Sequence, residues 1–143
     1  MPETIAIASD HAGFELKRVL VDELQQLGFS ALDLGTHDQS SVDYPDFADA
    51  LAAALADGRS KRGVLICGTG IGISIAANRH RHVRAALSHD TTSARLSRLH
   101  NDANVLALGS RLVGSEVARD CLKTFLATDF EGGRHQRRVA KMS

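Results

Sequence analysis

The sequence Gly63-Val-Leu-Ile-Cys67-Gly-Thr-Gly-Ile-Gly72 sets the architecture that we expect for the chain. Its first half, up to Cys67, is apolar at every position, which is typical of a central parallel strand covered on both faces. Its second half places glycines where a strand turns into a helix that should reach about Asn78. Since parallel strands need crossover connections, strands and helices should alternate on either side of this segment.

Short β-type runs do alternate with segments of helical period along the chain. Besides 63–67, the expected strands are 4–8, 30–34, 83–87 and 105–108. The first expected helix ends at Gly28, the second begins at Pro45 and ends near Gly58, and the third reaches about Asn78. The last two cover 90–100 and 114–127. This alternation predicts an α/β protein, a three-layer α/β/α, Rossmann-like fold with five parallel strands and right-handed crossovers. The order of the last two strands stays open.

The length of 143 residues matches one domain, and we expect residues 1–143 to form a single unit. The last part of the chain, about 128–143, is basic and short of apolar residues, so it should be a tail outside the core. Lys plus Arg and Asp plus Glu number 17 each. A neutral protein has no global field for nucleic acid or an anionic membrane, so any anion site must be local.

Two cysteines, Cys67 and Cys121, are too few for a disulfide scaffold, and they do not form a C-x-x-C motif. The apolar run 5–8 is too short for a signal peptide, and the weakly polar stretch 64–77 is too short for a membrane span. We therefore expect a cytoplasmic protein.

Ligands of open α/β sheets bind at the carboxyl ends of strands, where this sequence is rich in chemical groups. The loop Gly68–Gly72 can aim backbone N–H groups at an anion or a developing oxyanion near a helix start. It lacks the lysine of a P-loop, and Ile73 stands where the G-x-G-x-x-G motif needs a glycine. The loop therefore favours nucleotide binding less than these motifs would. A tight turn without a ligand remains the alternative.

Cys67 follows the strand directly, at a position where a helix start stabilises a thiolate, so it could be a base or nucleophile. A small buried apolar side chain is the alternative, and it is our interpretation of Cys121 in mid-helix. His11 and His100 lie at helix boundaries and could move protons or meet a phosphate, or could merely cap or pack.

Arg134 and Arg138 are four residues apart, so a helical tail would let both grip one phosphate; a solvated basic tail is the alternative. The hydroxyl of Tyr44 could reach a strand-end site or pack. His80 and His82 lack a carboxylate or cysteine partner in sequence, so a solvated loop is preferred there and no metal site is predicted.

Taken together, the motifs resemble the type B ribose-5-phosphate isomerases, a family that includes galactose- and allose-6-phosphate isomerases. The resemblance covers nearly the whole chain, in order and at family spacing. It rests on Ser9-Asp10-His11-Ala12-Gly13-Phe14 with Lys17, Asp43-Tyr44-Pro45, Cys67-Gly-Thr-Gly-Ile-Gly72 with Ala76-Ala77-Asn78, Ser97-Arg98-Leu99-His100-Asn101-Asp102-Ala103-Asn104-Val105, Gly109-Ser110-Arg111 and Glu131-Gly-Gly-Arg134.

The resemblance implies an enzyme of the non-oxidative pentose phosphate pathway that interconverts ribose 5-phosphate and ribulose 5-phosphate through an enediolate. It implies no metal, no cofactor, and a homodimer, or a tetramer, whose active sites draw on both subunits. The implied catalytic residues are Cys67 as proton acceptor, His100 as proton donor in ring opening, and Thr69. The implied substrate-binding residues are Asp10, His11, Tyr44, Gly68, Gly70, Ile71, Gly72 and Asn101. The implied phosphate ligands are Arg111, Arg134 and Arg138.

Some members of the family carry a glutamate base at the position of Ile73, which has no titratable proton, so Cys67 is the expected base here. Two other readings stay open. One is a hexose 6-phosphate isomerase with the same chemistry, and the other is a nucleotide-binding module without turnover.

Overall fold

A five-stranded sheet forms the middle layer of the molecule, with strand order β2-β1-β3-β5-β4 and every neighbouring pair parallel. The computed structural model describes all residues, Met1–Ser143. The strands are β1 Thr4–Ser9, β2 Ser30–Asp33, β3 Arg62–Cys67, β4 Ala85–Leu87 and β5 Val105–Gly109. The three-layer parallel fold predicted from the sequence is confirmed, and the structure supplies the order of the last two strands.

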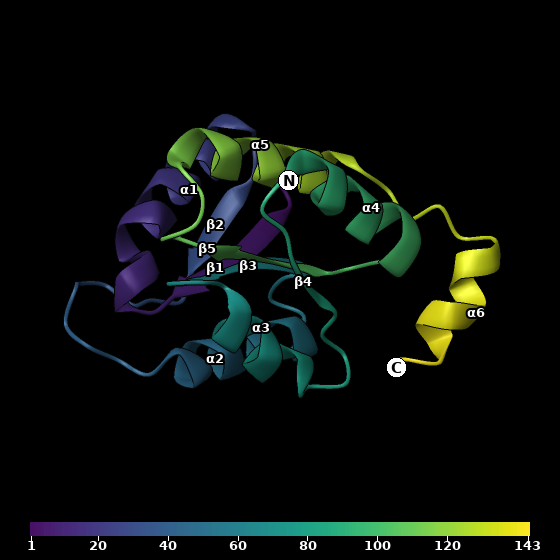
Figure 1. Ribbon diagram of the computed structural model, residues 1–143, viewed down its shortest axis with the longest axis horizontal. Helices are drawn as coiled ribbons and strands as arrows, with labels where there is room; N and C mark the ends of the chain where they lie inside the picture. Colours follow the sequence, from purple (N-terminus) through teal and green to yellow (C-terminus); the bar gives the residue numbers. More distant parts are fainter.

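Helices cover both faces of the sheet, with α1, α4 and α5 above it and α2 and α3 below it in Figure 1. The helical elements are the 3-10 turn His11–Gly13, α1 Phe14–Gln26, α2 Tyr44–Ala56, α3 Ile71–Asn78, α4 Thr91–Asn101, α5 Ser115–Ala127 and α6 Arg134–Ala140. Each face has its own apolar core, one of 16 and one of 12 buried residues. β3 contributes Val64 and Ile66 to one core and Leu65 and Cys67 to the other, as a central strand should.

The strand predicted at 83–87 begins two residues later than expected, at Ala85. The N–H group of Val83 donates to the carbonyl oxygen of His80 in a turn, and that of Arg84 donates to the Asn104 side chain. Val83 is buried, so this apolar residue packs in the core without being paired in the sheet.

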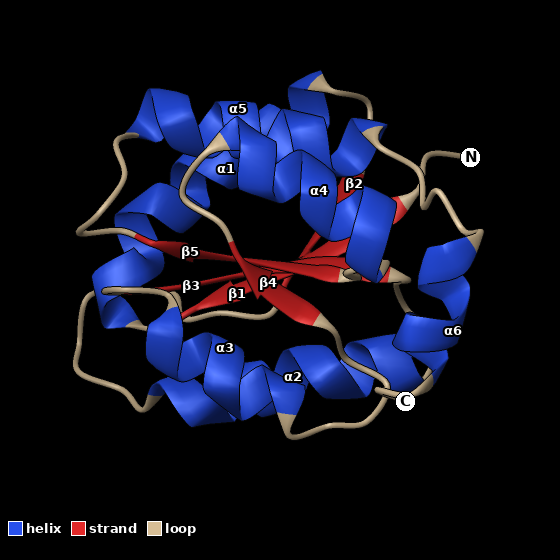
Figure 2. Ribbon diagram, turned by 45° about the vertical axis from the view of Figure 1, so that its right-hand side comes forward, coloured by secondary structure: helices blue, strands red, loops and turns tan.

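The tail contains a helix, α6, which stands to one side of the three layers (Figures 1 and 2). Its buried side chains are His135 and Val139, four residues apart on one face, and neither belongs to the two main cores. The helix therefore buries these two side chains outside the two main cores. None of the helices combines the length and the apolar character that a membrane crossing requires.

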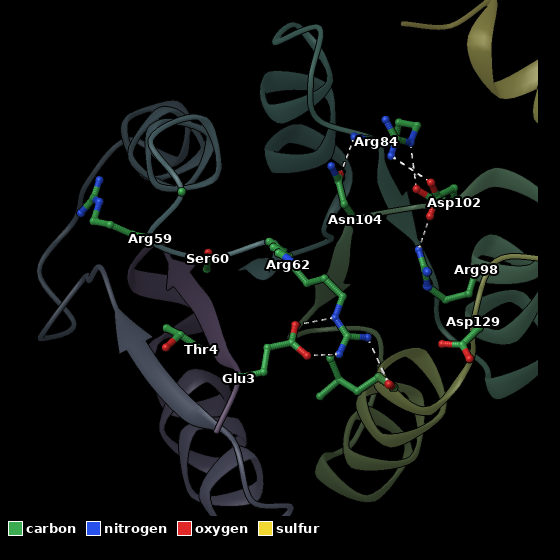
Figure 3. Close-up of a pocket in the computed structure, with 13 residues that line it drawn as sticks. Glu3, Thr4, Arg59, Ser60, Arg62, Arg84, Arg98, Asp102, Asn104 and Asp129 are labelled. Carbon is green, nitrogen blue, oxygen red and sulfur yellow. Dashed lines mark hydrogen bonds and ion pairs between the residues drawn. The ribbon is translucent and has the colours of Figure 1, made fainter. Parts of the chain in front are cut away.

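The amino edge of the sheet is held by bonds from arginines (Figure 3). Arg62 donates to both carboxylate oxygens of Glu3, at 2.9 and 2.7 Å, and to the carbonyl oxygen of Leu126. Arg98 and Arg84 both bond to Asp102, which follows α4. A hollow of about 690 Å³ lies among these groups. These three guanidinium groups already bond to the chain's own oxygens, so we assign this edge a structural role.

A buried lysine forms an ion pair near β1. Lys17 of α1 is 1% exposed, and its Nζ lies 2.7 and 2.6 Å from the two carboxylate oxygens of Asp33 at the end of β2. Asp33 also accepts the N–H group of Gly35, at 2.9 Å. An ammonium group this deeply buried is stable only while it is paired.

Replacing Asp33 by alanine should lower the free energy of unfolding by about 3 kcal/mol, because the charge of Lys17 would stay buried without a partner. Urea unfolding followed by circular dichroism measures this loss. Arg18→Ala is the matched control, since it removes an exposed ion pair with Glu15 on the same helix and should barely move the midpoint. Equal midpoints for Asp33→Ala and the native protein would contradict this role.

Candidate active site

The carboxyl ends of β1 and β3 meet where the chain order reverses, because β1 continues to β2 on one side and β3 leads to β4 and β5 on the other. Such a switch point is where open α/β sheets bind ligands. Cys67 ends β3 here, 4% exposed, and its Sγ accepts a hydrogen bond from the N–H group of Gly70 at 3.2 Å. A backbone N–H group therefore points at the sulfur from within the glycine loop.

Close packing explains two of the glycines at this edge. Gly70 has φ +76°, and a side chain there would also meet Leu87 at 2.6 Å and the Leu108 backbone at 2.8 Å. A Cβ on Gly109 would lie 2.5 Å from the carbonyl carbon and oxygen of Thr69. The loop after β3 therefore rests directly on the end of β5, and its backbone is fixed.

The start of α3 leaves donors free. Gly70, which precedes the helix, has no side chain to cap it. The N–H group of Ile71 donates to Thr69 Oγ1 at 3.1 Å. The following groups, on Gly72 and Ile73, belong to the first turn, where helical partners are absent. They can bind a negatively charged oxygen beside Cys67. Ile73 itself is fully buried in the core.

Asp10 and His11 directly follow β1 and lie beside the same loop. Asp10 is buried, and its Oδ1 accepts the N–H group of Gly13 at 3.1 Å. His11 Nδ1 accepts the N–H group of Val42 at 3.1 Å. Because Nδ1 is an acceptor in this bond, Nε2 of a neutral ring carries the proton and can donate it to a ligand.

Tyr44 and Arg111 close the hollow from two sides. It has a volume of about 350 Å³ and is lined by Asp10, Tyr44, Cys67, Gly68, Thr69, Ile71, Gly72 and Arg111. The Tyr44 ring packs on Gly72, where a Cβ would lie 2.6 Å from Cζ. The Arg111 guanidinium lies over Gly68, 3.3 Å from where its Cβ would be. Arg111 forms no ion pair within the chain, so its charge is available to an anion.

An adjoining hollow of about 580 Å³ shares Asp10 and Tyr44 with the first and adds His11. The structure thus brings ten of the predicted site residues to one edge of the sheet. They are Asp10, His11, Tyr44, Cys67, Gly68, Thr69, Gly70, Ile71, Gly72 and Arg111.

The other four predicted residues lie at the opposite end of the molecule. His100 and Asn101 end α4 just before Asn104, whose carbonyl oxygen accepts the N–H group of Gly63 at the amino end of β3. Arg134 and Arg138 lie on α6, exposed. β3 has six residues, so about 16 Å of strand separates its two ends. A single chain therefore does not bring His100 to Cys67.

The helix α6 packs against the end of α4. The rings of His100 and His135 stack with centroids 4.4 Å apart and planes 19° apart, and Glu131 Oε1 lies 3.9 Å from His135 Nε2. No motif in the sequence indicates a role for His135. Its only signal was its place one residue after Arg134, next to the matched segment Glu131-Gly-Gly-Arg134.

His80 and His82 lie in the turn between α3 and β4, and Cys121 lies in α5. His80 pairs with Asp49 at 2.8 Å and His82 with the carbonyl oxygen of Ala52 at 2.7 Å, so each has a partner in its loop. Cys121 is completely buried. Burial raises the pKa of its thiol to about 11, with smaller contributions from the carboxylates of Asp90 and Asp120. Cys121 is therefore an inert thiol of the core.

Comparisons with known proteins point to one family. The profile of the Ribose/Galactose Isomerase family matches residues 5–142. Ribose-5-phosphate isomerase B of Escherichia coli is 49% identical over 135 residues, covering 94% of this chain and 91% of that protein. D-erythrulose-4-phosphate isomerase of Pectobacterium atrosepticum is 43% identical over 141 residues, covering 97% and 92%.

Among solved structures, ribose-5-phosphate isomerase B of Clostridium thermocellum superimposes with a TM-score of 0.96 at 51% identity. The match covers 97% of this chain and 94% of that one. The resemblance inferred from the motifs is therefore confirmed along the whole chain: the protein belongs to the ribose/galactose isomerase family.

Proposed function

We propose that the protein interconverts ribose 5-phosphate and ribulose 5-phosphate, with Cys67 as the base that moves a proton between C2 and C1. The observation that carries the proposal is the Cys67 sulfur, bonded to the Gly70 N–H group in a hollow beside Asp10, Tyr44 and Arg111. Family membership and the name of the Escherichia coli relative support the substrate.

The chemistry follows from the groups around that sulfur. The Cys67 thiolate takes the proton from C2 of the open aldose, and the electrons of the C–H bond form the C1–C2 double bond of an enediolate. The same thiol returns the proton to C1, while the hydroxyl proton of O2 passes to O1, so that O2 becomes the ketone oxygen and O1 a hydroxyl. The free N–H groups at the start of α3 stabilise the negative charge that develops on oxygen.

The other residues at this edge bind the sugar in the proposal. Asp10 and the Nε2 proton of His11 face sugar hydroxyls, and Arg111 binds the phosphate as a free guanidinium. The remaining groups implied by the family resemblance are His100, Asn101, Arg134 and Arg138. In the same chain they lie beyond the other end of β3, a strand that is about 16 Å long.

A second copy of the chain supplies these distant residues in our proposal, so that the enzyme is a homodimer with two shared active sites. In a two-fold dimer each chain can place its α4 and α6 end against the Cys67 edge of its partner. The site divided between the two ends of one chain supports this arrangement. A cytoplasmic location remains the expectation for such an enzyme with two free cysteines.

Exposed apolar side chains beside the Cys67 edge also support a second copy. Ile71 and Ile75 lie four residues apart on α3 and are 49% and 53% exposed. Leu87 ends β4 and is 38% exposed, and Leu112 follows β5 and is 56% exposed. Leu87 lies close to Gly70 of the loop after β3. Large apolar side chains grouped beside a site mark an interface rather than a free surface.

Replacing Cys67 by serine should lower kcat for ribose 5-phosphate roughly 10²–10⁴-fold, because a hydroxyl at this place is a far weaker acid and does not form the base. The assay follows ribulose 5-phosphate formation in excess EDTA, which should leave the native rate unchanged. Cys121→Ala is the control and should keep the native kcat. A serine variant that retained more than about a tenth of native turnover would exclude Cys67 as the base.

The same assay decides the sugar. We expect the highest kcat/KM with ribose 5-phosphate among ribose 5-phosphate, allose 6-phosphate and galactose 6-phosphate. A higher value with either hexose phosphate would assign the enzyme to the six-carbon substrates while leaving the role of Cys67 intact.

Replacing Ile75 by glutamate should dissociate the dimer, because a charge in an apolar interface must be desolvated without a partner. Sedimentation equilibrium should give twice the 15.3 kDa chain mass, or a multiple of it, for the native protein and one chain mass for the variant. Gln25→Glu, which adds the same charge to an exposed position of α1, should leave the native mass unchanged. A native protein that sediments as a single chain would contradict the shared site.

A further inference from the structure

The contact between α6 and α4 centres on two imidazole rings. His100 and His135 lie 4.4 Å apart between centroids, with ring planes 19° from parallel. Stacking of flat rings is favourable and fixes the orientation of each ring relative to the other. His100 is the residue to which the proposed function gives the proton for ring opening, so the orientation of its ring matters for that step.

His135 is the fixed member of the pair. It is 6% exposed, whereas His100 is half-buried. The backbone around it is attached to α4, since the N–H group of Glu131 donates to the carbonyl oxygen of Leu99 at 3.1 Å. Val139, one turn further along α6, is buried on the same side. The His135 ring therefore cannot leave the stack without undocking α6.

The charge state suits this supporting position. Burial lowers the pKa of His135, and the guanidinium of Arg134 lowers it further, against a smaller opposing effect of Glu131. Its Nε2 is buried without a hydrogen-bond partner. The neighbouring ring of His100 also lowers the pKa of His135, because two stacked imidazolium rings would repel each other.

A metal site is the competing interpretation, because nitrogen and oxygen atoms of His100, Glu131 and His135 lie within 4.8 Å of one another. The ring geometry argues against it. A histidine nitrogen binds metal with the lone pair in the plane of its ring. Two rings that are nearly parallel and face to face direct these lone pairs along separate planes, so they do not converge on one ion.

We propose that His135 is a positioning residue, whose flat ring holds the imidazole of His100 in the orientation that delivers a proton to the ring oxygen of the sugar. This inference rests on the proposed function and deepens it. It assigns a role in ring opening, and no role in the proton transfer at Cys67, to a residue on α6.

Two variants of similar size separate flatness from simple filling of the buried space. His135→Phe keeps a flat ring, and His135→Leu replaces it by a branched apolar chain. We expect His135→Phe to keep kcat for ribose 5-phosphate within about threefold of native, and His135→Leu to lose about 10–100-fold, as a misplaced catalytic group does.

A second measurement tests whether the loss belongs to ring opening. Ribulose 5-phosphate carries its phosphate on O5 and cannot close to a five-membered ring, so Cys67 can exchange its C1 proton in D₂O without ring opening. Proton NMR of ribulose 5-phosphate in D₂O follows this exchange. We expect native exchange rates, within about twofold, for both variants.

The outcomes are distinct. Loss of exchange in proportion to turnover in His135→Leu would mean that His135 supports the whole fold, and equal losses in Phe and Leu variants would mean that flatness is irrelevant. Native turnover in His135→Leu would also overturn the proposal. Failure of the proposed function is recognised separately, because the native protein would then not convert ribose 5-phosphate at all.

Discussion

The hydrogen bond from the N–H group of Gly70 to the sulfur of Cys67 is the interaction on which the site depends. It exists because the chain leaves β3 through a left-handed residue at Gly70 and starts α3 at once. Any side chain at Gly70 or Gly109 would collide with Leu108 or with the backbone of Thr69. The two glycines thus fix the donor that holds the sulfur, and the same turn leaves the first N–H groups of α3 for a bound oxyanion.

The direction of the strands imposes the second constraint. All five strands are parallel, so every residue that follows a strand lies at one edge, and every residue that ends a following helix lies at the other. Cys67 belongs to the first set, and His100 belongs to the second. A reaction that uses both groups therefore requires a second chain. The exposed apolar side chains of α3 lie on the Cys67 side of the molecule. The stacked ring of His135 orients the imidazole of His100 within the single chain.

The sequence was sufficient for the layers and for the Cys67 edge, because both depend on local patterns. An apolar run such as Val64–Cys67 identifies a central strand, and a glycine loop after it identifies the binding edge. The sequence did not separate His100 from the Cys67 edge, because that separation arises from the direction of α4. The role of His135 and the pairing of Lys17 with Asp33 were also not predictable, since both depend on contacts between elements that no local pattern encodes.

The central claim is that Cys67 of one chain works with His100 of another, and mixing two inactive variants tests it most directly. Cys67→Ala and His100→Ala chains, unfolded together and refolded as random dimers, should regain about a quarter of native kcat per site. Half of the dimers are then mixed, and each mixed dimer has one intact site. Turnover that stays at the level of the separate variants, in dimers shown by mass spectrometry to be mixed, would contradict the shared site.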